Sequence, residues 1–116
     1  MDVMDDVDVP QVAVAELPAE FNPSVVLLDV READEWFSGH APDAVHVPMG
    51  EVPARLADLQ ADATYYVMCH AGGRSQRVAE YLVRNGYRAV NVSGGMLAWA
   101  GAGRPVVTDG GGTGTV

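Results

Sequence analysis

The sequence predicts an α/β domain with a mainly parallel sheet and helices on both faces. Short apolar or β-branched runs alternate with helix-like runs along the chain, which is typical of strands joined by crossover helices. The run Val25–Leu28 is continuously apolar, as expected for a strand that is buried on both faces. At 116 residues, 48% of them hydrophobic, the chain suits one domain with its own core.

Five segments are predicted as strands, because each is short and apolar and is followed by a residue or run that ends strands. They span residues 11–13, 25–28, 44–47, 64–68 and 89–92. Pro48 closes the third of them. The carboxyl ends of parallel strands are where ligands bind in sheets of this kind, and Cys69 follows the fourth strand.

The predicted helices lie between these strands. They span residues 15–21, 33–38, 51–59 and 75–85, with a short one that runs through Trp99. Val52, Leu56 and Leu59 have helical spacing, and a proline is tolerated in a first turn. Gly39 and the pair Asn85-Gly86 are expected to end two of the helices.

The composition is acidic, with sixteen acidic residues against seven basic ones and a formal charge of −9. Such a surface repels nucleic acid and anionic membranes, so neither is expected as a partner. Residues 1–8 are expected to form a solvated acidic extension. The glycine- and threonine-rich segment 105–116 is expected to be a flexible tail.

Cys69 is the only cysteine in the chain, which excludes an intramolecular disulfide framework. No apolar stretch is long enough to span a membrane, and the N-terminus has no basic region followed by an apolar core. A cytoplasmic location is therefore expected, where a single thiol stays reduced. The three histidines and one cysteine do not have the spacing of a zinc site, so no metal is expected.

The most informative segment is Cys69-His70-Ala71-Gly72-Gly73-Arg74-Ser75. A strand-like run precedes it and a helix-like run follows it. A glycine-rich loop before a helix N-terminus gathers free backbone N–H groups around one point. A thiol placed there loses its proton more easily than a free one, and the thiolate is the nucleophile.

Four short motifs occur in one order at domain-scale spacing: Leu28-Asp29-Val30-Arg31-Glu32, Gly39-His40, the loop from Cys69 to Ser75, and Gly94-Gly95-Met96-Leu97-Ala98-Trp99. Together they resemble the single-domain rhodaneses, which are thiosulfate-type sulfurtransferases. The resemblance extends from about Val9 to Arg104. It implies a rhodanese-like domain over residues 9–104, with three α/β/α layers and a mainly parallel five-stranded central sheet.

The resemblance implies that Cys69 is the catalytic nucleophile. In the family this thiolate attacks the sulfane sulfur of thiosulfate or of a persulfide donor, and holds the sulfur as a persulfide. Cyanide or a thiol, either small or carried by a protein, then accepts it. No metal or organic cofactor is implied. Covalent catalysis in two halves predicts ping-pong kinetics.

The remaining loop residues, His70, Ala71, Gly72, Gly73, Arg74 and Ser75, are predicted to bind the substrate. Backbone amides of the loop can stabilise a thiolate and a persulfide anion without a metal. Arg74 either points at the donor's oxyanions or pairs outward with an acid. Ser75 is predicted to be a helix N-cap. His70 is expected to line the pocket mouth and to tune acceptor choice, because adjacent residues rarely place an imidazole where it can take the thiol proton.

Residues outside the loop are expected to act structurally. Asp29 and Arg31 are predicted to form a charge pair or to bond nearby loops, with an alternative influence on the electric field of the pocket. His40 is expected to be a satisfied core or loop histidine. The chain departs from the family pattern at Asp43, which stands where a glycine is usual; a positive φ there would suit aspartate.

Three other functions compete with this interpretation. A cysteine-dependent phosphatase or arsenate reductase shares the loop position, but such enzymes need a longer run than the four residues between Cys69 and Arg74. A non-enzymatic regulatory or interaction module is the second, although such modules often lack the cysteine. The third, within the sulfur class, is a persulfide carrier fed by a cysteine desulfurase.

Overall fold

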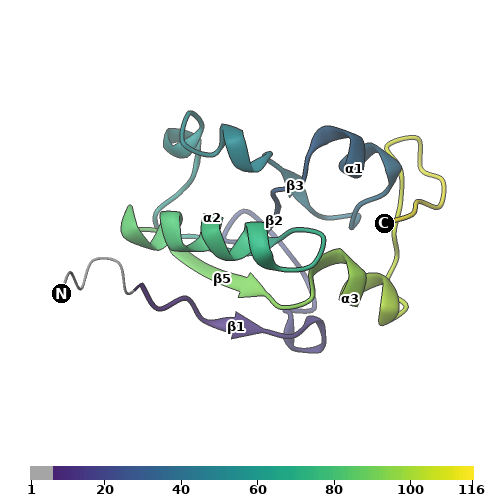
Figure 1. The fold of residues 1–116 in the computed structure, drawn as a ribbon, viewed down its shortest axis with the longest axis horizontal. Coiled ribbons are helices and arrows are strands. Elements are labelled where there is room, and N and C mark those ends of the chain that lie inside the picture. Colours follow the sequence, from purple (N-terminus) through teal and green to yellow (C-terminus); the bar gives the residue numbers. More distant parts are fainter. Residues whose placement is uncertain (1–6) are drawn as a thin grey trace.

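Five parallel strands form the central sheet in the computed structural model, which describes residues 7–116 (Figure 1). The strand order is β1-β5-β4-β2-β3. The strands are β1 Gln11–Val12, β2 Val25–Asp29, β3 Val45–His46, β4 Thr64–Met68 and β5 Arg88–Val92. Every pairing between these strands is parallel, and the prediction of a mainly parallel five-stranded α/β sheet is confirmed.

The centre of the sheet is β4, which lies between β5 and β2. Its register pairs Val67 with Leu28 on one side and with Asn91 on the other. Side chains alternate between the two faces of a strand. Cys69, the residue after β4, therefore shares a face with Val67, while Met68 lies on the opposite face.

Both faces of the sheet are covered, which makes three layers. The helices are α1 Ala33–Ser38, α2 Gly73–Arg84 and α3 Gly95–Gly101. One apolar cluster packs Leu28, Val67 and Cys69 against the buried face of α2. The other packs Leu27 and Met68 against α3. This two-sided burial accounts for the continuous apolar runs in the sequence.

Two predicted helices are wrong. Residues 15–21 form only the 3₁₀ turn η2, Val14–Glu16, because Leu17 precedes a proline and takes an extended conformation with ψ at 150°. Residues 51–59 form no α-helix either. They overlap two short 3₁₀ turns, η3 Met49–Glu51 and η4 Leu56–Asp58. A proline at position 53 has no backbone N–H with which to continue the hydrogen-bonding pattern of a helix.

The C-terminal segment differs from the expected flexible tail. Val107 exchanges two backbone hydrogen bonds of 2.9 Å with His40, and the amide of Thr115 donates to the carbonyl of Ser38 at 2.8 Å. These bonds need no large side chains, so a glycine-rich composition did not reveal them. Residues 105–116 are thus held against the end of α1 (Figure 1).

The predicted acidic extension, residues 1–8, falls mostly outside the described part of the chain. The domain boundaries at residues 9 and 104 stay predictions. None of the helices in residues 7–116 has the length and apolar character that crossing a membrane requires.

Candidate active site

The Cys69 sulfur lies at the carboxyl end of β4, beneath the N-terminus of α2. The residue is only 1% exposed. The amide of Gly72 donates a hydrogen bond to Sγ at 3.1 Å, and the hydroxyl of Ser75 lies 3.3 Å from the same atom. The loop therefore directs polar donors at the buried sulfur, in the manner of an anion cradle.

Two opposing effects act on the pKa of Cys69. Burial raises the pKa, because it disfavours the charged thiolate. The hydroxyl of Ser75 and the backbone amides of Ser75, Gly72 and Ala71 favour the thiolate by hydrogen bonding. Together the hydrogen bonds outweigh burial, so the pKa of Cys69 lies below its ordinary value. A thiol with a lowered pKa supplies more thiolate near neutral pH.

At Gly72 the chain passes from the loop into helix α2. Gly72 is the N-cap of α2, with a φ of +117° that residues with a Cβ rarely adopt. This turn lets α2 begin at Gly73, earlier than the predicted start at Ser75. It also aims the amide of Gly72 at the sulfur.

The opposite side of the loop is held by α3. The amides of Met96 and Leu97 donate to the carbonyl oxygens of Cys69 and His70, at 2.8 and 3.0 Å. These two bonds hold the start of the loop against the first turn of α3. A Cβ on Gly95 would collide with both carbonyl groups, and its φ is +54°. The sequence showed the Gly94–Trp99 motif but not this anchoring role.

The prediction that Ser75 is a helix N-cap is wrong. Ser75 lies in the first turn of α2, after Gly72 has already capped it. Its buried hydroxyl lies 2.6 Å from Oδ1 of Asn91 and 3.3 Å from the sulfur of Cys69. Ser75 therefore contacts the nucleophile through its side chain. Asn91 was not predicted from the sequence, although a polar residue between two valines of a strand was a visible signal.

Arg74 forms an ion pair with Glu35 of α1. Its two terminal nitrogens donate to the two carboxylate oxygens at 2.6 and 2.9 Å. This bonding lowers the pKa of Glu35 to about 2 and raises the pKa of Arg74. Of the two orientations that the sequence left open, the structure has the pair with an acid.

Asp29 and Arg31 form the predicted charge pair. Their side chains are 0% and 1% exposed and are joined by hydrogen bonds of 2.8 to 3.1 Å. Arg31 also donates to the carbonyl oxygen of Gly39 at 2.8 Å. The pair therefore joins the end of β2 to the end of α1.

His40 is a buried and satisfied histidine, as expected. Its ring nitrogens lie 3.0 Å from the carbonyl oxygen of Ala41 and 2.8 Å from the carboxylate of Asp109. The ring stacks on Trp36 with centroids 3.6 Å apart. Asp43 follows Ala41 in a turn and does not have a positive φ. It therefore fits this turn without a glycine-like conformation.

His70 lies beside a cavity of about 300 Å³. The other lining residues come from the end of β2, from α1 and from the C-terminal segment; they are Arg31, Asp34, Glu35, Ser38, Thr115 and Val116. The wall therefore includes the carboxylates of Asp34 and Glu35. Cys69 is not among the lining residues of this cavity, so the position of His70 at the mouth of the catalytic pocket stays a prediction.

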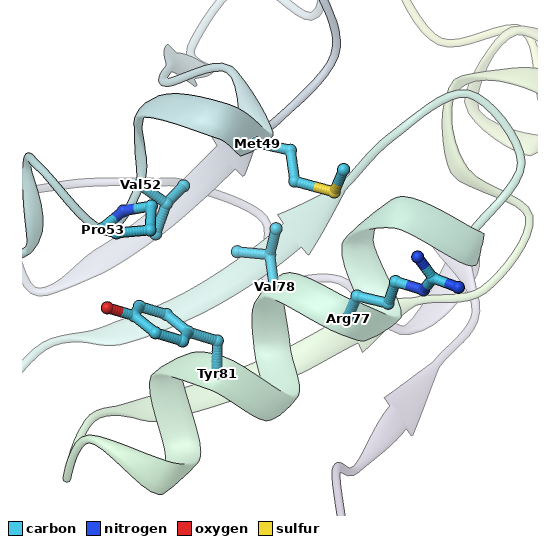
Figure 2. Close-up of a pocket in the computed structure, with 6 residues that line it drawn as sticks. All are labelled: Met49, Val52, Pro53, Arg77, Val78 and Tyr81. Carbon is cyan, nitrogen blue, oxygen red and sulfur yellow. The ribbon is translucent and has the colours of Figure 1, made fainter.

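A second cavity, of about 180 Å³, lies between α2 and the turns after β3 (Figure 2). Val78 and Tyr81 of α2 face Met49, Val52 and Pro53 across it, while the guanidinium of Arg77 points away from these side chains (Figure 2). This cavity is apolar and has none of the groups that act on Cys69. Among residues 7–116, no three histidine, cysteine or acidic side chains gather as metal ligands would.

Comparisons with known proteins agree with this fold. The family model of the rhodanese-like domain matches residues 13–102. The chain belongs to this family.

Two curated relatives are sulfurtransferases by name. YtwF of Bacillus subtilis, whose name assigns it provisionally to the sulfurtransferases, is 42% identical over 86 residues that cover 74% of this chain and 84% of the relative. A sulfurtransferase of Allochromatium vinosum is 38% identical, with coverage of 72% and 78%. A rhodanese-related protein of Thermoplasma volcanium has a solved structure that covers 86% of this chain and 99% of its own, with a TM-score of 0.78 and 32% identity. The sulfurtransferase class follows from these relatives.

Proposed function

We propose that this protein transfers a sulfane sulfur through a persulfide on Cys69. The donor is thiosulfate or a persulfide, and the acceptor is cyanide or a thiol. The observation that carries the proposal is the set of donors around one buried sulfur: the amide of Gly72 at 3.1 Å and the hydroxyl of Ser75 at 3.3 Å.

In the first half-reaction the Cys69 thiolate attacks the outer sulfur of thiosulfate. A new S–S bond forms, the S–S bond of the donor breaks, and sulfite leaves with the electron pair. The negative charge of the thiolate passes to the outer sulfur of the persulfide. In the second half-reaction an acceptor thiolate attacks that sulfur, and Cys69 leaves again as a thiolate. A lowered cysteine pKa favours both the attack and the departure.

The loop suits a small sulfur anion because most of its donors belong to the backbone, and the remaining one is the hydroxyl of Ser75. Amides fixed by the helix start and by the anchor to α3 need no reorganisation when charge reaches the sulfur. His70 belongs to the loop and lines the cavity of about 300 Å³. We infer that the acceptor enters there, past the carboxylates of Asp34 and Glu35.

The same geometry argues against a phosphatase. A phosphoryl group is best held by an arginine that offers two parallel N–H donors. Both terminal nitrogens of Arg74 are bonded to Glu35. In our proposal Arg74 supports the loop by its charge and by its link to α1, and the backbone amides bind the donor.

Intact-mass measurement after incubation with thiosulfate tests the proposal. We expect the full chain to gain the mass of one sulfur atom and to lose it again when cyanide or a thiol is added. The matched Cys69→Ser variant keeps the size of the side chain and gains nothing. A parallel incubation with a small-molecule persulfide separates a thiosulfate enzyme from a carrier that is loaded only by persulfides.

Two outcomes would contradict sulfur transfer through Cys69. The first is a wild-type chain that gains no mass from either donor, as expected for an interaction module. The second is an equal gain in the Cys69→Ser variant, which would place the sulfur elsewhere.

A further inference from the structure

Asn91 is a buried amide in the second half of strand β5. The residue is 4% exposed and lies between Val90 and Val92. Asparagine is depleted in strands, and burying an amide is costly unless it is fully hydrogen-bonded. In this register Asn91 lies beside Val67 of β4, on the sheet face that α2 covers. The position calls for a physical explanation.

The orientation of the Asn91 amide is fixed by its neighbours. Its Nδ2 donates to Oε1 of Gln11 at 2.8 Å and lies 3.4 Å from the carbonyl oxygen of Gly72. Gln11 in turn donates its own Nε2 to the carbonyl oxygen of Val9. Backbone carbonyls only accept hydrogen bonds, so neither amide can be reversed without loss. The Oδ1 of Asn91 is thereby presented to Ser75.

The hydroxyl of Ser75 has a single proton and two acceptors within reach. Oδ1 of Asn91 is 2.6 Å away and Sγ of Cys69 is 3.3 Å away. While the sulfur is protonated, the hydroxyl donates to Asn91, and the thiol donates to the hydroxyl oxygen. Once the sulfur is an anion, it accepts the hydroxyl proton more strongly than a neutral amide does. The proton then turns from Asn91 to Cys69.

We propose that Asn91 is a positioning residue that acts on Cys69 through Ser75. It holds the hydroxyl beneath the sulfur and competes for its proton, so it limits how readily the thiol ionises. The inference rests on the proposed function only in taking Cys69 as the nucleophile. Gln11, which orients the amide, is exposed on the edge strand β1, so the network runs from the protein surface to the sulfur.

Other groups around the sulfur do not take part in this competition. Arg74 of α2 is paired with Glu35 of α1, Asp29 is paired with Arg31 at the end of β2, and His70 lies at the cavity wall. None of these five side chains is hydrogen-bonded to Asn91. Their fields should therefore stay constant when Asn91 is replaced.

The test is a pH titration of the Cys69 thiol by NMR. The chain has one cysteine, so cysteine labelled with ¹³C at Cβ gives one signal that reports ionisation without any reagent reaching a buried atom. We expect Asn91→Leu to lower the pKa of Cys69 by about half a unit to one unit, because the Ser75 proton loses its competing acceptor. Ser75→Ala should raise the pKa by a similar amount.

The double variant separates a positioning role from a general structural one. In the Ser75→Ala background, Asn91→Leu should no longer change the pKa, because the proton for which Asn91 competes is gone. Ser93→Ala is the matched control, since Ser93 is exposed and bonds the same Gln11 oxygen. It should leave the pKa unchanged. An unchanged or raised pKa in Asn91→Leu, or a shift that persists without Ser75, would overturn the inference.

A second measurement uses the unaltered chain, should a variant fail to fold. The side-chain amide signals of Asn91 should shift with the same midpoint as the Cys69 titration, because Oδ1 loses its donor when the thiolate forms. This shift should vanish in Cys69→Ala. Amide signals that stay constant through the thiol titration would sink the inference. Neither readout involves sulfur transfer, so their failure is distinguishable from a failure of persulfide formation.

Discussion

Asp29 ends strand β2 and Cys69 follows strand β4. Two buried ionisable groups therefore lie near each other at the carboxyl ends of these adjacent parallel strands. Asp29 is balanced by the full charge of Arg31, through hydrogen bonds of 2.8 to 3.1 Å. Among residues 7–116, the hydrogen bonds to the Cys69 sulfur come from a hydroxyl and backbone amides. An ion pair satisfies its carboxylate completely, whereas dipoles stabilise an anion and leave it able to react. The ion pair of Asp29 and Arg31 therefore stabilises the fold, whereas the hydrogen-bonded sulfur of Cys69 is suited to act as a nucleophile.

The largest expected effect on stability comes from breaking the buried ion pair of Asp29 and Arg31. Asp29→Asn leaves the Arg31 guanidinium buried without a balancing charge, so we expect a loss of about 3–5 kcal/mol in the free energy of unfolding. Urea unfolding measures it. Asp58→Asn removes an acid from the exposed pair with Arg55, and should change stability by no more than about 1 kcal/mol. Equal effects of the two substitutions would show that burial does not distinguish the pairs.

Gly95→Ala is expected to cause a smaller loss of stability and a marked loss of reactivity of the Cys69 thiol. The new Cβ would collide with the carbonyl groups of Cys69 and His70, and a positive φ with a side chain costs about 1–3 kcal/mol. The displaced loop should raise the pKa of Cys69. Gly101→Ala, in the same helix with no atom near the new Cβ, is the control. A Cys69 titration that is identical in Gly95→Ala and wild type would refute the anchoring role of α3.

The smallest effect concerns the Arg74–Glu35 pair. Glu35 has a folded-state pKa of about 2 against an ordinary value of 4.5, so the pair stabilises the fold above pH 4.5 and loses this contribution as the pH falls toward 2. Glu35→Gln should therefore lower stability by less than about 1 kcal/mol at neutral pH. Unfolding midpoints measured across the acid range should converge for the two proteins. Parallel curves at every pH would contradict the assigned pair.

The sequence predicted what depends on local pattern. The strand before Cys69, the glycine turn and the following helix are neighbours in the chain, so the cradle was visible without coordinates. Contacts between segments that are distant in the chain could not be predicted in this way. Glu35 as the partner of Arg74 and Asn91 as the partner of Ser75 depend on how α1 and β5 pack against α2.

Local rules also failed where a neighbour overrode them. Ser75 has the residue type of an N-cap, but the N-cap is Gly72, three residues earlier. Ser75 therefore lies inside the first turn of α2, where its hydroxyl is buried. The C-terminal segment is rich in glycine, yet backbone bonds to residues 38 and 40 hold it, and Val106 packs against one of the apolar clusters.

The anchoring of the loop by α3 has a consequence for the newly made chain. Met96 and Leu97, which orient the carbonyls of Cys69 and His70, are synthesised after the cysteine. Until that later helix docks, these two carbonyl groups lack their amide partners, so the loop is not yet held from this side. The support of the loop around Cys69 is therefore completed only by residues that follow the cysteine in the chain.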